Sequence, residues 1–231
     1  MREKILFDDG WLFHLGEVER RTPSNKGALY TGAKTSRARW GAASENYNDA
    51  PDGYWIAHEQ LAEKWVTVDL PHDYMIEKTP SEENNNALGF VEYENAWYRK
   101  HISFGAEDMD KRISFIFDGV ATNATVYFNG VLVAHNYCGY TSFEVDVTDF
   151  IRFCQDNVLA VYVDAVSQDG WWYDGGGIYR HVWLQKTDRV SVDLYGVYLK
   201  PRHESADDWR VGVGTTGRYG GDEIADIRVE G

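Results

Sequence analysis

Cysteine is scarce in this sequence, with only Cys138 and Cys154 among 231 residues. Two cysteines provide neither a disulfide framework nor a metal site by themselves, so we expect both to be reduced. The histidines also lack metal-ligand spacing. We therefore expect neither a metal nor any other cofactor.

Long apolar runs and positive charge are also missing. No run approaches the roughly 20 apolar residues of a membrane span, and the N-terminus lacks the apolar core of a secretion signal. The 23 Lys and Arg residues face 37 Asp and Glu residues, which gives a formal charge of −14. Nucleic acid and anionic membranes are therefore not expected as partners, whereas neutral or cationic ligands remain open. A cytoplasmic protein is the default, although a fragment would lack any preceding signal.

Aromatic residues and glycines are abundant, which is typical of β-rich chains: 15% of residues are aromatic and 22 are glycine. Asn129-Gly130 lies between two apolar segments and predicts a hairpin, because both residues accept positive φ angles. Segment 158–163 is apolar on both faces and is expected to be a central strand. Convincing amphipathic helices are absent. Further strands are predicted at 65–70, 96–104, 113–117, 143–147, 181–185 and 190–200, so we expect an all-β, two-sheet antiparallel sandwich.

The segment 171–184 combines features that a sugar-contacting loop needs. Trp171, Trp172 and Tyr173 precede Asp174 and three glycines, and a β-like pattern follows. The apolar face of a pyranose packs on an aromatic ring, while its hydroxyls need nearby polar groups. Alternatively, the tryptophans belong to the core and the glycines form a turn, and the residues alone do not decide between the two.

Other side chains have structural interpretations. Trp97, Trp183 and Tyr179 lie in strand patterns and are expected in the core. Arg180 is expected in a structural ion pair, since a buried arginine needs a carboxylate. His72 and Asp73 follow Pro71 and are expected to form a turn that orders the edge of the domain.

The C-terminal part of the chain follows a different pattern. After Pro201, two weak strand patterns flank the glycine-rich segment 217–221. Two strands and a hairpin cannot bury a core on their own. We therefore expect a first domain over 1–200 and, over 201–231, the start of a truncated second β domain or a β appendage.

Several motifs together resemble the N-terminal sugar-binding domain of glycoside hydrolase family 2, which includes β-galactosidases, β-glucuronidases and β-mannosidases. They occur in the order seen in that family, over about the first 200 residues. The motifs are Phe7-Asp8-Asp9-Gly10-Trp11-Leu12-Phe13, Val68-Asp69-Leu70-Pro71-His72-Asp73-Tyr74, Trp97-Tyr98-Arg99-Lys100, Phe117-Asp118-Gly119-Val120, Val126-Tyr127-Phe128-Asn129-Gly130, Gly139-Tyr140-Thr141-Ser142-Phe143, Asn157-Val158-Leu159-Ala160-Val161 and Gly177-Ile178-Tyr179-Arg180-His181-Val182-Trp183-Leu184.

The resemblance implies a jelly-roll sandwich of the galactose-binding type. In complete members of the family, an immunoglobulin-like domain and a catalytic (β/α)₈ barrel follow. The barrel supplies two glutamates for retaining hydrolysis and needs about 250 residues of its own. The acid/base glutamate of the family follows an asparagine, and no Asn-Glu dipeptide occurs in this sequence. We therefore expect no catalytic residues in this chain, and the immunoglobulin-like domain is expected to begin in the short C-terminal β extension.

The resemblance also points to sugar-contacting residues. In β-galactosidases of the family, an aspartate ahead of the Gly-Ile-Tyr-Arg strand holds galactose hydroxyls, and Asp169 and Asp174 are the candidates here. For each of them, a turn-capping role beside glycine is the alternative. Trp171 and Trp172 alternate in direction if they are extended, so one is expected to face the loop. Asn95 is a further candidate, because family members place a second polar group nearby.

Three functions remain open from the sequence. The first is a non-catalytic domain of a β-galactosidase-like enzyme that shapes the sugar-binding mouth for a β-glycoside or galactose-like substrate. In that case it also braces the downstream barrel of the same protein. The second is a self-standing carbohydrate-binding module without a catalytic partner. The third is a purely structural sandwich that contacts only neighbouring domains.

Overall fold

The fold is all-β, as the sequence predicts. The computed structural model describes residues 2–18, 42–44, 65–166, 174–205, 207–219 and 223–229. Within these ranges, the helices are three short 3-10 turns, Asn86–Leu88, Ala106–Asp108 and Thr148–Phe150. In the same part of the chain, no helix has the length and apolar character needed to cross a membrane.

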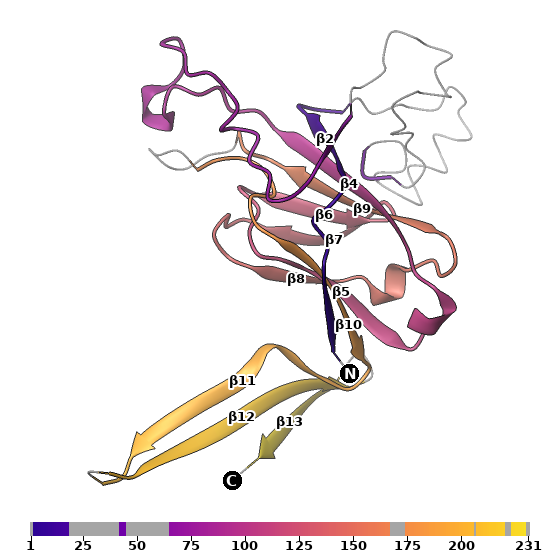
Figure 1. Ribbon diagram of the computed structural model, residues 1–231, viewed down its shortest axis with the longest axis vertical. Helices are drawn as coiled ribbons and strands as arrows, with labels where there is room; N and C mark the ends of the chain where they lie inside the picture. Colours follow the sequence, from indigo (N-terminus) through magenta and orange to yellow (C-terminus); the bar gives the residue numbers. More distant parts are fainter. Residues whose placement is uncertain are drawn as a thin grey trace.

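Two antiparallel sheets form the sandwich (Figure 1). The smaller sheet has the order β1-β10-β5-β8, and the larger has the order β3-β2-β4-β9-β6-β7. In the smaller sheet the strands are β1 (Glu3–Leu6), β10 (Val182–Asp188), β5 (Lys111–Phe117) and β8 (Phe143–Asp146). In the larger sheet they are β3 (Val66–Val68), β2 (Trp11–Leu15), β4 (Ala96–Ser103), β9 (Asp156–Val163), β6 (Ala124–Phe128) and β7 (Val131–Asn136). The strands predicted at 96–104, 113–117, 143–147 and 181–185 correspond to β4, β5, β8 and β10.

The core lies between the two sheets and is rich in aromatic side chains. Phe115 and Phe117 of β5 belong to one buried cluster with Tyr98 of β4, Phe128 of β6 and Leu159 of β9. All five are 0% exposed. Alternation along each strand brings these residues to the inner face, and burial of such large side chains stabilises the sandwich by about 2 kcal/mol each.

Two sequence predictions about the larger sheet are confirmed. Strand β9 lies between β4 and β6, and Val158 to Val161 are buried on both of its faces. The β6–β7 hairpin turns at Asn129 and Gly130, which have φ angles of 49° and 79°. These positive values are the ones that the Asn-Gly pair accepts most readily.

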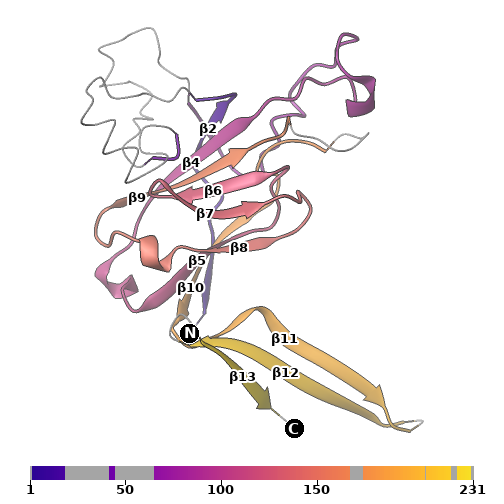
Figure 2. The same ribbon diagram turned by 180° about the vertical axis from the view of Figure 1, so that it is seen from behind.

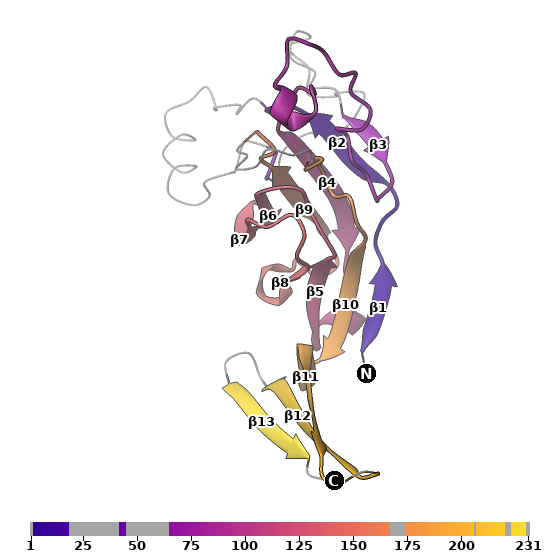
Figure 3. The same ribbon diagram turned by 90° about the vertical axis from the view of Figure 1, so that its left-hand side faces the viewer.

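A third sheet follows the sandwich. It contains β11 (Ser191–His203), β12 (Trp209–Tyr219) and β13 (Glu223–Val229). Figures 1, 2 and 3 show this sheet extending away from the sandwich, beside the N-terminal end of β1. Its register places Leu199 opposite Val213 and Pro201 opposite Val211, so these apolar residues share one face. Leu199, Val211 and Val213 are all exposed there.

The division of the chain into two domains stays a prediction. Strand β11 runs across residue 200, so we propose that the second unit begins at Ser191, directly after the β10–β11 turn. The exposed apolar face of the β11–β13 sheet supports this proposal, because a sheet of this size needs a second layer to be stable.

Hydrogen exchange tests the proposed division. We expect the amides of β11 and β12 to exchange at least about a hundredfold faster than those of β9, because the third sheet lacks a buried core and opens without unfolding the sandwich. Amide exchange of the 231-residue chain, followed by mass spectrometry, measures this ratio. Equal protection in β9, β10, β11 and β12 would show one cooperative unit and contradict the boundary.

Candidate functional site

The glycine-rich segment before β10 is fixed by the turn at His72 and Asp73. The Asp73 Oδ1 atom accepts hydrogen bonds from the backbone N–H of Met75 at 2.9 Å and of Gly176 at 3.0 Å. The backbone N–H of His72 donates to the carbonyl of Ile178 at 2.8 Å. His72 and Asp73 thus order this edge as expected, but they do so from just before the turn, which spans Tyr74 to Glu77.

Glycine is required at position 177 by a close approach. Gly177 has a φ of 121°, and a Cβ atom there would lie 2.3 Å from the Tyr98 hydroxyl and 2.5 Å from the His72 carbonyl oxygen. Its backbone also pairs with Ala121, through N–H to carbonyl bonds of 2.9 Å and 2.7 Å. Three distant parts of the chain thus meet at one residue without a side chain.

Tyr98 and His72 form a buried polar contact beside this glycine. The Tyr98 hydroxyl lies 2.7 Å from Nδ1 of His72. Burial lowers the pKa of His72 from 6.5, and the nearby charges of Glu77 and Asp73 oppose this shift only in part. Burial also raises the pKa of Tyr98 well above its ordinary value, so its proton stays in place for hydrogen bonding.

Asp174 is one of the predicted sugar-contacting residues, and it lies directly before the glycines. Its Oδ1 atom accepts a 2.8 Å hydrogen bond from the Tyr140 hydroxyl. Its backbone N–H donates to the Tyr93 hydroxyl at 3.3 Å. Asp174 is therefore held by side chains from two other segments, one at its carboxylate and one at its backbone.

Asn95 is anchored in a different polar cluster, at the start of β4. Its Nδ2 atom donates to Glu17 Oε1 at 2.9 Å, and its Oδ1 atom accepts from the backbone N–H of Val166 at 3.3 Å. The Tyr162 hydroxyl donates to the same oxygen of Glu17. The pKa of Tyr162 is raised by burial and then by its hydrogen bond to Glu17.

The remaining candidates, Asp169, Trp171 and Trp172, lie outside the described residues. The two described candidates, Asn95 and Asp174, lie at opposite ends of the segment 167–173, which contains the other three. Asn95 binds the backbone of Val166, and Asp174 follows the segment directly. Among the described residues, no group of three His, Cys, Asp or Glu side chains is placed to hold a metal ion.

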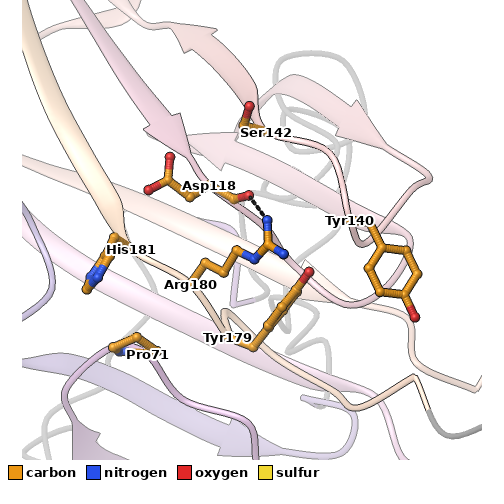
Figure 4. A pocket seen from close by; sticks show the side chains of 7 residues that line it. All are labelled: Pro71, Asp118, Tyr140, Ser142, Tyr179, Arg180 and His181. Atoms are coloured by element: carbon orange, nitrogen blue, oxygen red, sulfur yellow. Dashed lines mark hydrogen bonds between the residues drawn. The ribbon is translucent and has the colours of Figure 1, made fainter.

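A surface pocket of about 370 Å³ lies beside Asp174. Sequence reasoning did not single it out as a site, although its residues come from four of the family-like motifs. Tyr140 connects the two features, since it lines the pocket and donates its hydroxyl to Asp174. The lining residues are Pro71, Asp118, Tyr140, Ser142, Tyr179, Arg180 and His181 (Figure 4).

The expectation that three aromatic residues belong to the core is wrong for Trp183 and Tyr179, which are only half-buried. Trp183 donates its indole N–H to Asp118 at 2.8 Å, and Tyr179 donates its hydroxyl to the carbonyl of Gly139 at 2.8 Å. Trp97, on β4, is also half-buried, but it packs against a small buried cluster. Strand alternation explains the error, because Trp183 points to the outer face between buried Val182 and Leu184.

Arg180 does not form the expected ion pair with any described residue. It is exposed, and its Nη1 atom donates to the backbone carbonyl of Asp118 at 3.5 Å. Its guanidinium carbon lies 5.2 Å from the centre of the Tyr179 ring, within range of a cation–π interaction. The sequence motif predicted a strand, but β10 begins two residues later, at Val182, which leaves Arg180 outside the sheet.

A comparison with known proteins identifies the family. A family model described as "Glycosyl hydrolase 2 galactose-binding domain-like" matches residues 40–173. The match covers more than half of the chain, and the chain belongs to this family, as its motifs suggest.

Individual relatives agree with this assignment. A β-galactosidase of Bacteroides ovatus is 40% identical over 152 residues, covering 64% of this chain and 18% of the relative. A β-glucuronidase of Formosa agariphila is 29% identical over 170 residues, covering 64% of this chain and 16% of the relative. The crystal structure of a β-glycosidase from Bacteroides vulgatus is 26% identical, with a TM-score of 0.73 over 96% of this chain and 25% of that one. The chain thus corresponds to less than a third of each of these proteins.

Substitution of Gly177 tests the close approach. Gly177→Ala should destabilise the fold by about 3 kcal/mol, because the new methyl group overlaps Tyr98 and His72. Gly10→Ala is a matched control: Gly10 also has a positive φ, of 66°, but its Cβ would meet nothing within 4 Å. The control should lose only about 1 kcal/mol. Denaturant unfolding measures both values, and equal losses would contradict the steric argument.

The lowered pKa of His72 predicts a pH dependence of stability. The unfolded chain binds a proton at His72 near pH 6.5, whereas the folded chain binds it only at lower pH. Stability should therefore fall as the pH drops below 6.5. Between about pH 7.5 and 5.5, His72→Asn should lose less unfolding free energy than the wild-type chain. His135→Asn, at an exposed histidine, serves as the control, and an unchanged loss in His72→Asn would refute the prediction.

Proposed function

We propose that this chain is the non-catalytic N-terminal domain of a family 2 β-glycosidase of the β-galactosidase type. Its role is to shape the sugar-binding mouth and to brace the catalytic barrel of the full-length protein. The family assignment supports the general class, and the 40% identity to a β-galactosidase supports the subtype. The cytoplasmic location inferred from the sequence is part of the same proposal.

The observation that carries the proposed role is the anchoring of Asn95 and Asp174. Both were predicted from family-like motifs, and the two lie in separate polar clusters next to the same segment, 167–173. The Oδ1 atom of Asp174 accepts from Tyr140, and a carboxylate oxygen has more than one lone pair with which to accept hydrogen bonds. Such a carboxylate orients a sugar by accepting from its hydroxyls.

A substrate of this kind fits the electrostatics of the chain. With a formal charge of −14, the domain does not favour polyanions, and a neutral galactoside carries no charge to be repelled. The hydrolysis itself requires a glutamate pair, which we assign to the barrel of the full-length protein. The domain then contributes affinity and orientation rather than bond cleavage.

Kinetics of the full-length protein test this role. Asp174→Asn should lower kcat/KM for a chromogenic β-galactoside by about tenfold to a hundredfold, the effect expected on losing a charged hydrogen bond to the sugar. Asp149→Asn is the control, because Asp149 is an exposed aspartate in the 3-10 turn after β8. An unchanged kcat/KM in Asp174→Asn would contradict a contact with the sugar.

Assays of the isolated chain distinguish a domain of a glycosidase from a self-standing carbohydrate-binding module. The 231-residue chain alone should neither hydrolyse the galactoside nor bind galactose detectably, because part of the subsite lies on the barrel. Saturable galactose binding by this chain that is lost in Trp172→Ala would favour the module. A natural gene that encodes this domain without a catalytic barrel would also favour the self-standing module.

A further inference from the structure

The pocket beside Asp174 contains one cationic group whose hydrogen-bonding capacity is almost unused. Arg180 carries five N–H donors. Among the described residues, its one hydrogen bond is the 3.5 Å contact with the carbonyl of Asp118, at the long limit for such a bond. The guanidinium is nevertheless held in place, because it lies against the Tyr179 ring. Figure 4 shows it between Tyr179 and the backbone of Asp118, on the side of the pocket that faces Tyr140.

Two tyrosine hydroxyls at the pocket donate to protein acceptors, and the serine hydroxyl shares its hydrogen bond with a third tyrosine. Tyr179 donates to Gly139 at 2.8 Å, and Tyr140 donates to Asp174 at 2.8 Å. The Ser142 hydroxyl shares a 2.6 Å hydrogen bond with that of Tyr195. The free donors at this end of the pocket therefore belong mainly to Arg180, so a matching ligand must be rich in acceptors.

The carboxylates at the pocket contact groups other than Arg180. The Asp118 carboxylate accepts from the indole N–H of Trp183 at 2.8 Å, and in Figure 4 it points away from the guanidinium. Asp8 contacts the pocket residue His181, with Oδ2 2.6 Å from Nδ1 of His181. Charges elsewhere on this acidic chain are screened beyond about 8 Å in physiological salt. The Asp118 carboxylate keeps its negative charge, but it is directed to the indole rather than to the guanidinium, so it does not occupy the N–H donors of Arg180.

We propose that this pocket is a carboxylate-binding site in which Arg180 is the principal ligand-binding residue. The planar guanidinium presents parallel N–H groups at the spacing of two carboxylate oxygens, which a compact ammonium group cannot do. The volume of about 370 Å³ accommodates one monosaccharide or one amino-acid side chain. The carboxylate comes either from a uronic acid or from an acidic side chain of a polypeptide. The proposal does not depend on sugar binding at Asp174.

Two matched pairs of probes test the site and separate the two sources. Methyl β-glucuronide is compared with neutral methyl β-glucoside, and N-acetylglutamate amide with neutral N-acetylglutamine amide. Ligand-observed NMR titration of the 231-residue chain measures the affinities. At least one carboxylate should bind saturably, with its neutral counterpart at least about tenfold weaker. Tighter binding of the glucuronide identifies a uronic acid as the source, and tighter binding of the glutamate derivative identifies a polypeptide.

Variants of the chain assign the binding to Arg180. Arg180→Gln should weaken carboxylate binding at least about tenfold, whereas Arg189→Gln, at an exposed arginine in the β10–β11 turn, should leave it unchanged. Arg180→Lys keeps the charge and should still lose several-fold in affinity, which preserves the test if the glutamine variant fails to fold. The proposal is overturned if neither carboxylate binds, if the neutral probes bind equally well, or if Arg180→Gln and Arg189→Gln behave alike.

Discussion

The hydroxyl of Tyr98 is the point at which the core of the sandwich meets the loops at its surface. The Tyr98 ring is fully buried against Phe13, with 5.1 Å between ring centres. Its hydroxyl contacts His72 on one side and leaves no room for a side chain at Gly177 on the other. A buried hydroxyl without a partner costs about 1–3 kcal/mol, so the loop backbone must stay where the core requires it. The surface loops that carry Asp174 and Arg180 are thus positioned from inside the sandwich.

Much of the fold could be predicted from sequence because its signals are local. The Asn129-Gly130 turn and the apolar strand β9 depend on φ preferences and on burial of both faces, which short segments encode. The motifs also identified the family and named Asp174 and Asn95 as candidates, but the position of Asn95 beside Val166 came only from the structure. Local signals placed Trp183 in a strand but did not show which face of the sheet it lies on. A shift of one position along a strand moves a side chain from the inner face to the outer face.

The pocket escaped prediction for a different reason. Its residues come from four separated segments, and each residue has an ordinary structural interpretation by itself. The sequence predicted that Arg180 forms an ion pair. Whether an arginine has a carboxylate partner depends on which side chains lie near it in the folded chain. Only the three-dimensional arrangement shows that the carboxylate of Asp118 binds the Trp183 indole instead. Predicting this would require contacts between residues 62 and 65 positions apart.

The third sheet contacts one pocket residue, Ser142, through a β-bulge in β11. The register with β12 shifts between Val192 and Val197, and Tyr195 within the shift has a φ of 59° and is 78% exposed. A positive φ is unfavourable for a bulky residue, by about 1–3 kcal/mol, so the surroundings must hold Tyr195 in this conformation. Its hydroxyl bonds to that of Ser142 in the pocket wall, and Arg2 at the N-terminus reaches the carbonyl of Val192. The bulge is therefore tied to the sandwich at Val192 and at Tyr195, so contacts with the sandwich, rather than the local preference of the chain, set its conformation.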